Sequence, residues 1–275
     1  MLDYFTEVKN MNEQIDIAKA REQKVVKHNE LIQNTRYSLP TQQLKTLSYL
    51  ISKIKPTDKE FQIYEFQIID YCKCCGIDYA NGKNYKNVKT SLKDLSDNSF
   101  WMENEAGGEN LFRWLSEVDI NKKGGLVKVE FDKKLHPYLI GLVANFTQYE
   151  LLSTLPMKSQ YSIRIYELMK SYAFKKTITL EINDLKKKLM AEQYINFKDF
   201  RIKVLEIAMR EINEYTDLKV SCEGNTGGRG RAITSVTFTI KLRSGFDKLR
   251  AQSRAIEDIK GLERGLDGQM SIYEY

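Results

Sequence analysis

The stretch from Asn196 to Leu242 restricts the possible folds more than any other part of the sequence. Asn196 can cap the first turn of a helix, and Asp199, three residues later, completes the pattern of a capping box. Apolar residues then recur at spacings of three and four, which predicts one buried face on a helix of about twenty residues. The residues of this face are Phe197, Phe200, Val204, Ile207, Ala208, Ile212 and Tyr215. Alternating stretches at 218–223 and 233–242, joined by a glycine-rich turn, predict a hairpin after the helix.

Cations gather on the polar side of this predicted helix and in the turn of the hairpin. The helix carries four of them, the last at the edge of the apolar face: Lys198, Lys203, Arg210 and Arg201. Since the helix macrodipole favours anions near the N-terminus, cations there indicate an external polyanion. The turn adds Arg229 and Arg231. A helix followed by a basic hairpin is the plan of a winged helix, whose helix enters the DNA major groove while the wing contacts the backbone or minor groove. The alternative is a helix and hairpin of an ordinary α+β core with solvated arginines.

The first half of the chain predicts the same order of elements. A helix begins near Pro40, a short strand covers 60–66, a second helix ends at Gly76, a third covers 83–97, and strands at 111–120 and 126–131 form a basic hairpin. The third helix buries Tyr85, Val88, Leu92 and Leu95, and a parallel ridge carries three lysines: Lys86, Lys89 and Lys93. A helix from Gln160, a strand at 177–180 and a helix at 182–190 precede the basic helix of the second half in the same way. The predicted fold class is therefore α+β, with two tandem winged-helix domains.

A chain of 275 residues is long enough for two domains. We predict an N-terminal arm at 1–24 that is mobile or weakly helical, a first winged-helix domain at 25–150 and a second at 151–244. Residues 245–275 read as a charged helix that decays into a tail, partly disordered. The segment 136–156 is apolar for a linker, which predicts contact between the domains or with a partner.

Composition narrows the class of protein. Forty-three Lys and Arg against 37 Asp and Glu give a net charge of +6, a mild basic bias that is compatible with nucleic acid but does not prove it. The sequence has no apolar run of about 18 residues and no signal peptide, so we expect a cytoplasmic protein that does not enter the membrane. The spacing of Cys72, Cys74 and Cys75 does not fit a zinc site, which favours thiols in a reducing compartment and no metal.

Several segments resemble the initiator Rep proteins of theta-replicating plasmids. The specific block lies in the second half, and the opening motif at 25–32 with 37–39 is similar to that of the same family. The matching segments of the block are 161–168, 197–208, 211–213, 216–218 and 230–231. The match covers Lys198, Arg201, Lys203, Gly230 and Arg231, whereas Lys86, Lys89 and Lys93 rest on their helix position alone.

The resemblance implies an initiator of plasmid replication without catalytic activity or cofactor. It implies that both winged helices bind directly repeated origin sequences in double-stranded DNA (iterons), and that host helicase or initiator proteins are recruited. It also implies a homodimer in equilibrium with the monomer: dimers repress the initiator's own promoter while monomers bind iterons. Opening of an A·T-rich segment is likewise carried over from the family.

Other classes remain as alternatives. A rolling-circle nickase needs a His-apolar-His metal motif, but the only histidines are His28 and His136, far apart in the sequence, and the sequence has no phosphate-binding loop of an ATPase. The stronger rival is a two-domain winged-helix transcriptional repressor without an origin role, and a protein-interaction module is the third class. Direct repeats of about 20 base pairs next to the gene favour an initiator, and a lone inverted repeat favours a repressor.

The predicted DNA contacts divide into three groups. Lys86, Lys89, Lys93 and Lys198 are predicted to meet phosphates, and Arg229 and Arg231 to hold the flanking backbone or minor groove. Arg201, Lys203 and Arg210 are predicted to read base edges, because cationic side chains pair with guanine O6 and N7.

Overall fold

The structure is a computed structural model that describes residues 16–77, 83–103, 107–121, 124–227 and 232–270. The first winged helix follows the predicted order. Its elements are helix α4 (Thr41–Ile51), strand β2 (Tyr64–Gln67), helices α5 (Ile68–Cys75) and α6 (Lys83–Asp97), and strands β5 (Leu115–Ile120) and β6 (Leu126–Phe131), with sheet order β2-β6-β5. Gly76 ends α5 with a positive φ of 67°, as a glycine at that position should.

The second winged helix repeats this plan. Its elements are helices α8 (Gln160–Ser171), α9 (Ile182–Leu189), α10 (Phe197–Phe200), the π-helical segment η4 (Arg201–Glu206) and α11 (Ile207–Tyr215), with strands β8 (Thr177–Glu181), β9 (Leu218–Thr226) and β10 (Ile233–Leu242) in the order β8-β10-β9. In both sheets the strand before the second helix pairs with the last strand of the wing. The prediction of two tandem winged helices is therefore confirmed.

Two predicted strands of the first domain differ from the structure. The predicted strand at 60–66 is confined to β2, which begins at Tyr64. The predicted strand at 111–120 is interrupted at Trp114 and forms two strands. The Trp114 side chain at the interruption is completely buried. The residues before Trp114 form β4 (Glu109–Arg113), which pairs with β3 (Ser99–Glu103) in a separate hairpin between α6 and β5. The alternation of apolar residues continues through the break, so the sequence pattern does not reveal it.

A two-stranded sheet joins parts of the chain that are far apart. Strand β1 (Lys24–His28) pairs antiparallel with β7 (Phe146–Glu150), in a register that places Lys24 opposite Glu150. Helix α3 (Asn29–Gln33) follows β1, so the segment 25–32 is a strand and then a helix. The segment predicted as an apolar linker contains α7 (His136–Leu139), β7 and the 3-10 turn η2 (Leu151–Ser153), so it is folded.

The second half of the predicted N-terminal arm is more ordered than expected. Asp16 caps helix α2 (Ile17–Glu22) by accepting a hydrogen bond from the Lys19 amide. Arg21 is buried and donates hydrogen bonds to the carbonyl oxygens of Lys73 and Cys74 at 2.8 and 2.9 Å. These carbonyls lie in the last turn of α5, where helix carbonyls lack partners. The helix at Ile17–Glu22 agrees with the helical alternative of the prediction, and it packs on α5; residues 1–15 lie outside the described part.

A buried ion pair joins β1 to α8. Lys27 on β1 donates a hydrogen bond of 2.6 Å to Glu167 on α8, and both side chains are at most 2% exposed. The Tyr149 hydroxyl donates to the same carboxylate oxygen at 2.5 Å. Arg164, one turn earlier on α8, donates to the Thr35 carbonyl and lies over the ring of Tyr37. Burial alone would raise the pKa of Glu167, but the charges of Lys27 and Arg164 lower it below its ordinary value.

This pKa shift predicts a specific pH dependence. Because the folded-state pKa lies below the ordinary value of 4.5, ionised Glu167 stabilises the fold above that pH, and this contribution is lost as the pH falls through the folded pKa. The comparison is with Glu167→Gln, whose amide does not titrate. Urea unfolding from pH 7 to pH 3 should show the parent more stable at pH 7 and the difference narrowing in acid. A difference that widens in acid would contradict the shift.

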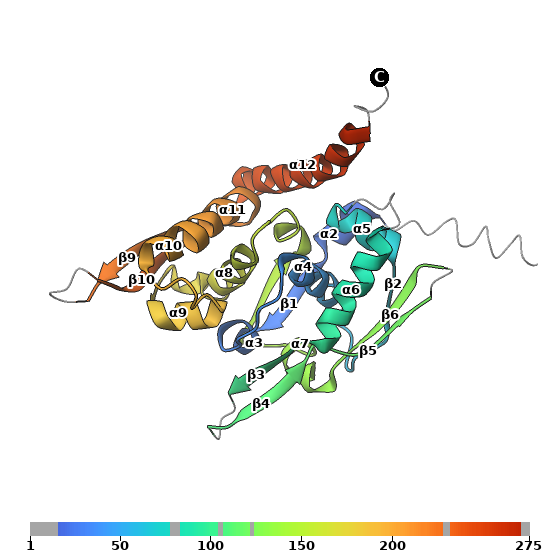
Figure 1. Cartoon of the computed structure of the whole chain (residues 1–275), viewed down its shortest axis with the longest axis horizontal. Coiled ribbons are helices and arrows are strands. Elements are labelled where there is room, and N and C mark those ends of the chain that lie inside the picture. The colour runs from blue at the N-terminus through green and yellow to red at the C-terminus, as the bar shows by residue number, and fades with distance from the viewer. Residues whose placement is uncertain (1–15, 78–82, 104–106, 122–123, 228–231, 271–275) are drawn as a thin grey trace, which may run out of the picture.

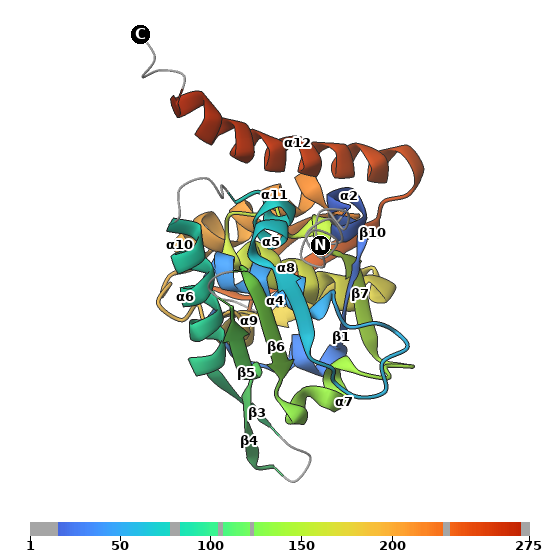
Figure 2. The same ribbon diagram turned by 90° about the vertical axis from the view of Figure 1, so that its right-hand side faces the viewer.

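The C-terminal segment is more regular than predicted. Helix α12 (Gly245–Met270) follows β10 and crosses both domains (Figures 1 and 2). Its buried side chains include Ala251, Ala255 and Ile259, which recur at spacings of four residues. The expected charged helix is present, but it extends to Met270, and at least as far as Ile259 it is packed on the body of the protein. Residues 271–275 lie outside the described part.

Candidate DNA-binding surface

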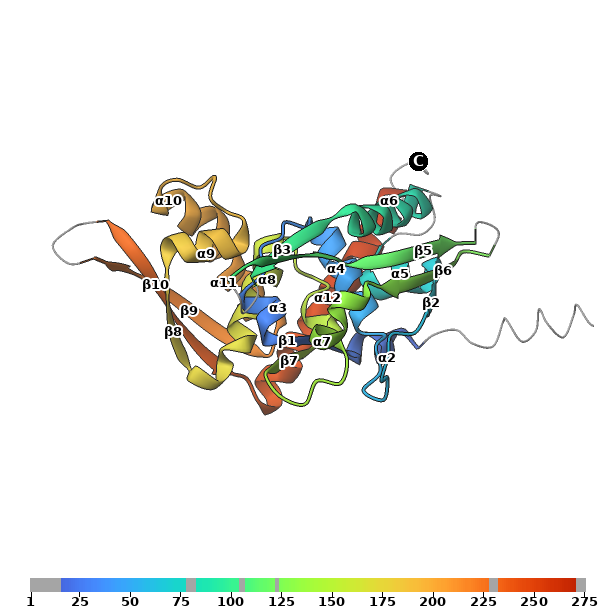
Figure 3. The same ribbon diagram turned by 90° about the horizontal axis from the view of Figure 1, so that it is seen from below.

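The recognition helices of the two domains lie on one side of the molecule. In Figures 2 and 3, α6 and α10 both lie along the same edge, and Figure 3 shows the two wings extending toward opposite ends. The recognition helix of the first domain is α6, which follows α5. That of the second domain is the continuous run of α10, η4 and α11, which follows α9, as the helix-turn-helix geometry requires. The fold thus presents two helices and two wings to a single extended partner.

The helix of the second domain begins where the sequence predicts. Asn196 Oδ1 accepts a hydrogen bond of 2.8 Å from the Asp199 amide. The reciprocal bond of the capping box is formed between side chains, from Asn196 Nδ2 to Asp199 Oδ2 at 2.9 Å. The N-cap function of Asn196 is confirmed. The Asp199 carboxylate accepts a hydrogen bond from the side chain of Asn196 and not, as in a standard capping box, from its backbone N–H.

A π-helical turn changes which side chains face outward. An α-helix turns about 100° per residue, and one extra residue in a π turn sets the following residues back by roughly that angle. By this count Leu205 turns inward and Ile207 outward, which agrees with a buried Leu205 and a half-buried Ile207. The predicted apolar face is corrected at these two positions. The same shift brings Arg210 onto the side of Lys198, and both are exposed.

The four cations predicted on this helix are all exposed, and two of them have specific neighbours. Arg201 Nε lies 3.3 Å from Glu206 Oε1, a pair five residues apart that the wide π turn brings together. Lys203 Nζ lies 5.9 Å from the centre of the Tyr194 ring. Since both side chains of the Arg201 pair are more than half exposed, the pair stabilises the helix little and leaves Arg201 available to a ligand.

Ile202 is a surface residue of this helix that was not predicted as a DNA contact from the sequence. It is 41% exposed and lies between the cations of η4, although the predicted apolar face did not contain it and no role was assigned to it. The sequence did contain a signal for this role, because Ile202 is an apolar residue that lies outside the predicted buried face of a recognition helix. Such side chains contact the methyl group of thymine in the major groove.

Glu211 is the second residue that the sequence reading missed. Its side chain is buried and accepts hydrogen bonds from the amides of Lys158 and Ser159 at 3.1 and 3.3 Å. These amides precede α8, so the carboxylate satisfies free N–H groups at a helix N-terminus. The contact fixes α11 against α8 and positions the recognition helix.

The first domain exposes its predicted lysines. Lys86, Lys89 and Lys93 lie on the outer side of α6, while Val88, Leu92 and Leu95 are buried as predicted. Lys93 forms an ion pair with Asp97, four residues later on the same helix. The hydrogen bond to Asp97, together with the Asp97 charge, raises the pKa of Lys93, and that charge offsets part of the positive potential of Lys93. Lys86 and Lys89 are therefore the stronger candidates for an anionic ligand.

The base of the second wing packs closely on the recognition helix. A Cβ added at Gly224 on β9 would lie 2.9 Å from Phe197 Cζ and 3.1 Å from Ile233 Cγ2, so this position favours glycine. The predicted wing cations Arg229 and Arg231, and the matching Gly230, lie outside the described residues. Their placement stays a prediction.

The described residues contain no group of three or more metal-binding side chains. Cys72, Cys74 and Cys75 are buried on α5 and Cys222 is half-buried on β9, and these four cysteines form no disulfide. Among the residues that the structure describes, no helix is both long enough and apolar enough to cross a membrane.

Comparisons with known proteins agree with the two-domain architecture. Residues 24–170 match the family model described as "Initiator Replication protein, WH1", and residues 181–240 match "Initiator Rep protein, WH2". An uncharacterized 27.6 kDa protein of Escherichia coli is 26% identical over 210 residues, which cover 71% of this chain and 87% of that protein. The PI protein of Escherichia coli is 27% identical over 146 residues, which cover 47% of each.

A solved structure has the same fold. The crystal structure of the Pi initiator protein in complex with iteron DNA superimposes with a TM-score of 0.66, covering 82% of this chain and 99% of that one. The sequence identity is 19%, so this likeness establishes the fold alone.

Proposed function

This chain belongs to the initiator replication protein family, and from that premise we propose that it starts plasmid replication by binding direct repeats of origin DNA through both winged helices. The observation that carries this proposal is that α6 and α10 lie on one side of the molecule, each with exposed cations. The Pi initiator, which shares the fold, was crystallised with iteron DNA. Proteins of this family bind DNA and are not enzymes, in agreement with the lack of catalytic motifs in the sequence.

The two recognition helices enter successive major grooves on one side of the duplex. Neighbouring major-groove sites on one side are separated by about 10 to 10.5 base pairs, so one chain covers roughly two turns. Lys86, Lys89 and Lys198 contact phosphates, with a smaller contribution from Lys93. Arg229 and Arg231 hold the backbone or minor groove beside the second site.

The recognition helix of the second domain recognises the DNA bases. Arg201, Lys203 and Arg210 pair with base edges, and Ile202 contacts a thymine methyl group between them. Glu206 orients the Arg201 guanidinium through their ion pair. The chain acts in the cytoplasm, in equilibrium between a monomer that binds the repeats and a homodimer that represses its own promoter. Bound repeats recruit host helicase or initiator proteins beside an A·T-rich segment that opens.

Footprinting on the DNA that flanks the gene tests this function. At two salt concentrations, the chain should protect tandem direct repeats of about 20 base pairs, with binding that weakens steeply as salt rises. Protection of a lone inverted repeat would instead support a repressor without an origin role. Absence of salt-sensitive protection would refute DNA binding by this surface.

Replacing Arg201 with alanine should alter which bases are recognised. Loss of one cationic contact to a base edge costs about 1–3 kcal/mol at the positions that it reads. Affinities for a set of repeats with single base changes give the measurement, and the variant should lose discrimination at one or two positions. Arg250→Ala is the matched control, because Arg250 is exposed on α12 and loses the same charge. If both variants discriminate like the parent, Arg201 does not read bases.

A further inference from the structure

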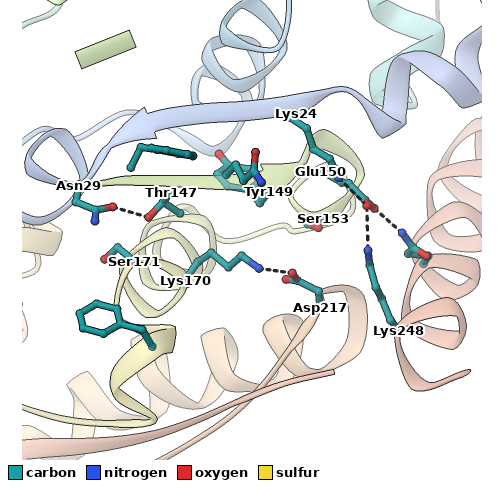
Figure 4. Close-up of a pocket in the computed structure, with 14 residues that line it drawn as sticks. Lys24, Asn29, Thr147, Tyr149, Glu150, Ser153, Lys170, Ser171, Asp217 and Lys248 are labelled. Carbon is teal, nitrogen blue, oxygen red and sulfur yellow. Dashed lines mark hydrogen bonds and ion pairs between the residues drawn. The ribbon is translucent and has the colours of Figure 1, made fainter. Parts of the chain in front are cut away.

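Helix α12 contacts both domains on a side of the molecule where their direct interface is incomplete. Figures 1 and 2 show it passing over α11 and then over α5. A cavity of about 430 Å³ lies near its first turns, between β7 and α8 (Figure 4). Lys170 and Asp217 of the second domain, Thr147 of β7 and Lys248 of α12 are among its lining residues. The chain is thus not close-packed there, and Lys248 and Gln252 of α12 line one side of the cavity.

The middle of α12 is fixed to the second recognition helix. The Tyr215 hydroxyl, at the last residue of α11, donates a hydrogen bond of 2.5 Å to Asp258 Oδ2. One residue earlier on α11, Glu214 lies 3.2 Å from Arg254 Nε. The Tyr215 side chain is buried, so its hydrogen bond is less exposed to competition from water than the surface pair.

The same helix is fixed to the first domain at two places. Glu150, at the end of β7, is only 14% exposed and pairs with Lys248 at 3.0 Å, and it also accepts a hydrogen bond from Gln252 (Figure 4). Further along, Ile259 is completely buried against the end of α5. A Cβ added at Gly76 would lie 2.7 Å from Ile259 Cγ2 and 3.2 Å from the Ile259 carbonyl oxygen. The backbone of α12 therefore lies directly against the residue that ends α5.

These contacts join the two DNA-reading units themselves. Gly76 ends the helix that precedes recognition helix α6, and Tyr215 ends recognition helix α11. Since Asp258 and Ile259 are consecutive residues, a single turn of α12 holds both. A shift of either recognition helix relative to the other would strain this turn or break one of its contacts.

We propose that α12 is a brace that fixes the spacing and rotation of the two recognition helices, and thereby the length of repeat that one chain can read. Tyr215, Asp258, Ile259 and Glu150 are its positioning residues. The proposal rests on the proposed function, since it concerns how both helices bind one repeat. The direct contact through Lys27 and Glu167 is a second, separate link. The brace adds stiffness, which matters because two linked modules bind tightly only when their geometry permits simultaneous contact.

The decisive variant is Ile259→Asp, which places a carboxylate against Gly76 and should release the far half of α12. Its matched control is Ser253→Asp, the same added charge on the exposed side of the helix. Each is tested on the repeat found by footprinting, on a repeat lengthened by two base pairs between the two half-sites, and on the second-domain half-site alone.

The expected result has three parts. Ile259→Asp binds the parental repeat about tenfold more weakly than Ser253→Asp, is penalised less by the two-base-pair insertion, and binds the half-site equally well. Equal behaviour of the two variants on all three DNAs would overturn the brace. Tenfold weaker binding to the half-site as well would also overturn it, because the defect would then lie inside the second domain.

A second variant and a measurement without DNA distinguish loss of the brace from other causes of weak DNA binding. Tyr215→Phe removes only the hydroxyl that binds Asp258, and should weaken binding to the parental repeat by a smaller factor in the same pattern. Small-angle X-ray scattering of the free proteins should show a broader distribution of interatomic distances for Ile259→Asp than for Ser253→Asp. If the parent binds no repeat, the proposed function fails, and the scattering comparison alone still decides for or against the brace.

Discussion

Replacing Lys27 with methionine is expected to lower the free energy of unfolding by about 3–5 kcal/mol. The methionine keeps most of the side-chain volume but leaves the Glu167 carboxylate buried without its cation. Tyr149 donates one hydrogen bond to that carboxylate, and Arg164 lowers its pKa, but neither replaces a direct ion pair of 2.6 Å. Denaturant unfolding at pH 7 measures the loss.

Lys24→Met is the matched control for this experiment. Lys24 also lies on β1 and pairs with a carboxylate, Glu150, but its side chain is 48% exposed. Exposed pairs contribute at most about 1 kcal/mol, so this variant should change little. The double variant Lys27→Met with Glu167→Leu removes both charges and should recover much of the loss. Equal losses for Lys27→Met and Lys24→Met would mean that the buried pair is not a special contact between the domains.

Replacing Lys86, Lys89 and Lys198 together with alanine should cause the largest loss of DNA affinity. Each phosphate contact contributes about 0.9 to the slope of log affinity against log salt, so the slope should fall by about 2.7. The same relation predicts an affinity loss on the order of 100-fold near physiological salt. Titrations of repeat DNA at several salt concentrations measure both quantities.

Two controls define the meaning of that loss. Lys241 on β10 and Arg250 and Lys260 on α12 are exposed and are not among the predicted DNA contacts, so their triple replacement by alanine removes the same charge from other positions. It should lower affinity only slightly. Lys93→Ala should lower the slope by less than Lys89→Ala, because Asp97 already pairs with Lys93. Equal losses for the two triple variants would show that the net charge, and not the placement of the lysines, determines binding.

The sequence predicted those parts of the fold that short-range chemistry determines. Asn196 caps its helix and Gly76 ends another, because capping and left-handed backbone are local properties. The pairing of β1 with β7 could not be predicted in this way, since it joins Lys24 to Glu150 across the whole first domain. The packing of Ile259 on Gly76 is non-local for the same reason.

The candidate site was predictable to a similar degree. The exposure of Lys86, Lys89 and Lys198 followed from helix periodicity, and the structure agrees. Periodicity assumes a regular α-helix, so it could not reveal the π turn that buries Leu205 and brings Arg201 to Glu206. Whether these residues contact DNA stays a prediction, as do the roles of Arg229 and Arg231.

The contacts of helix α8 determine which fragments and chimeras of this chain can fold. One side of it packs on α11 of the second domain, and the other carries Arg164 and Glu167 against β1 and α3 of the first. A fragment that begins at residue 151 would expose both charged side chains where Lys27 and Tyr37 now cover them. A chimera that exchanges the second domain between relatives should therefore carry β1, α3 and β7 with it, so that α8 keeps the surface on which it packs here.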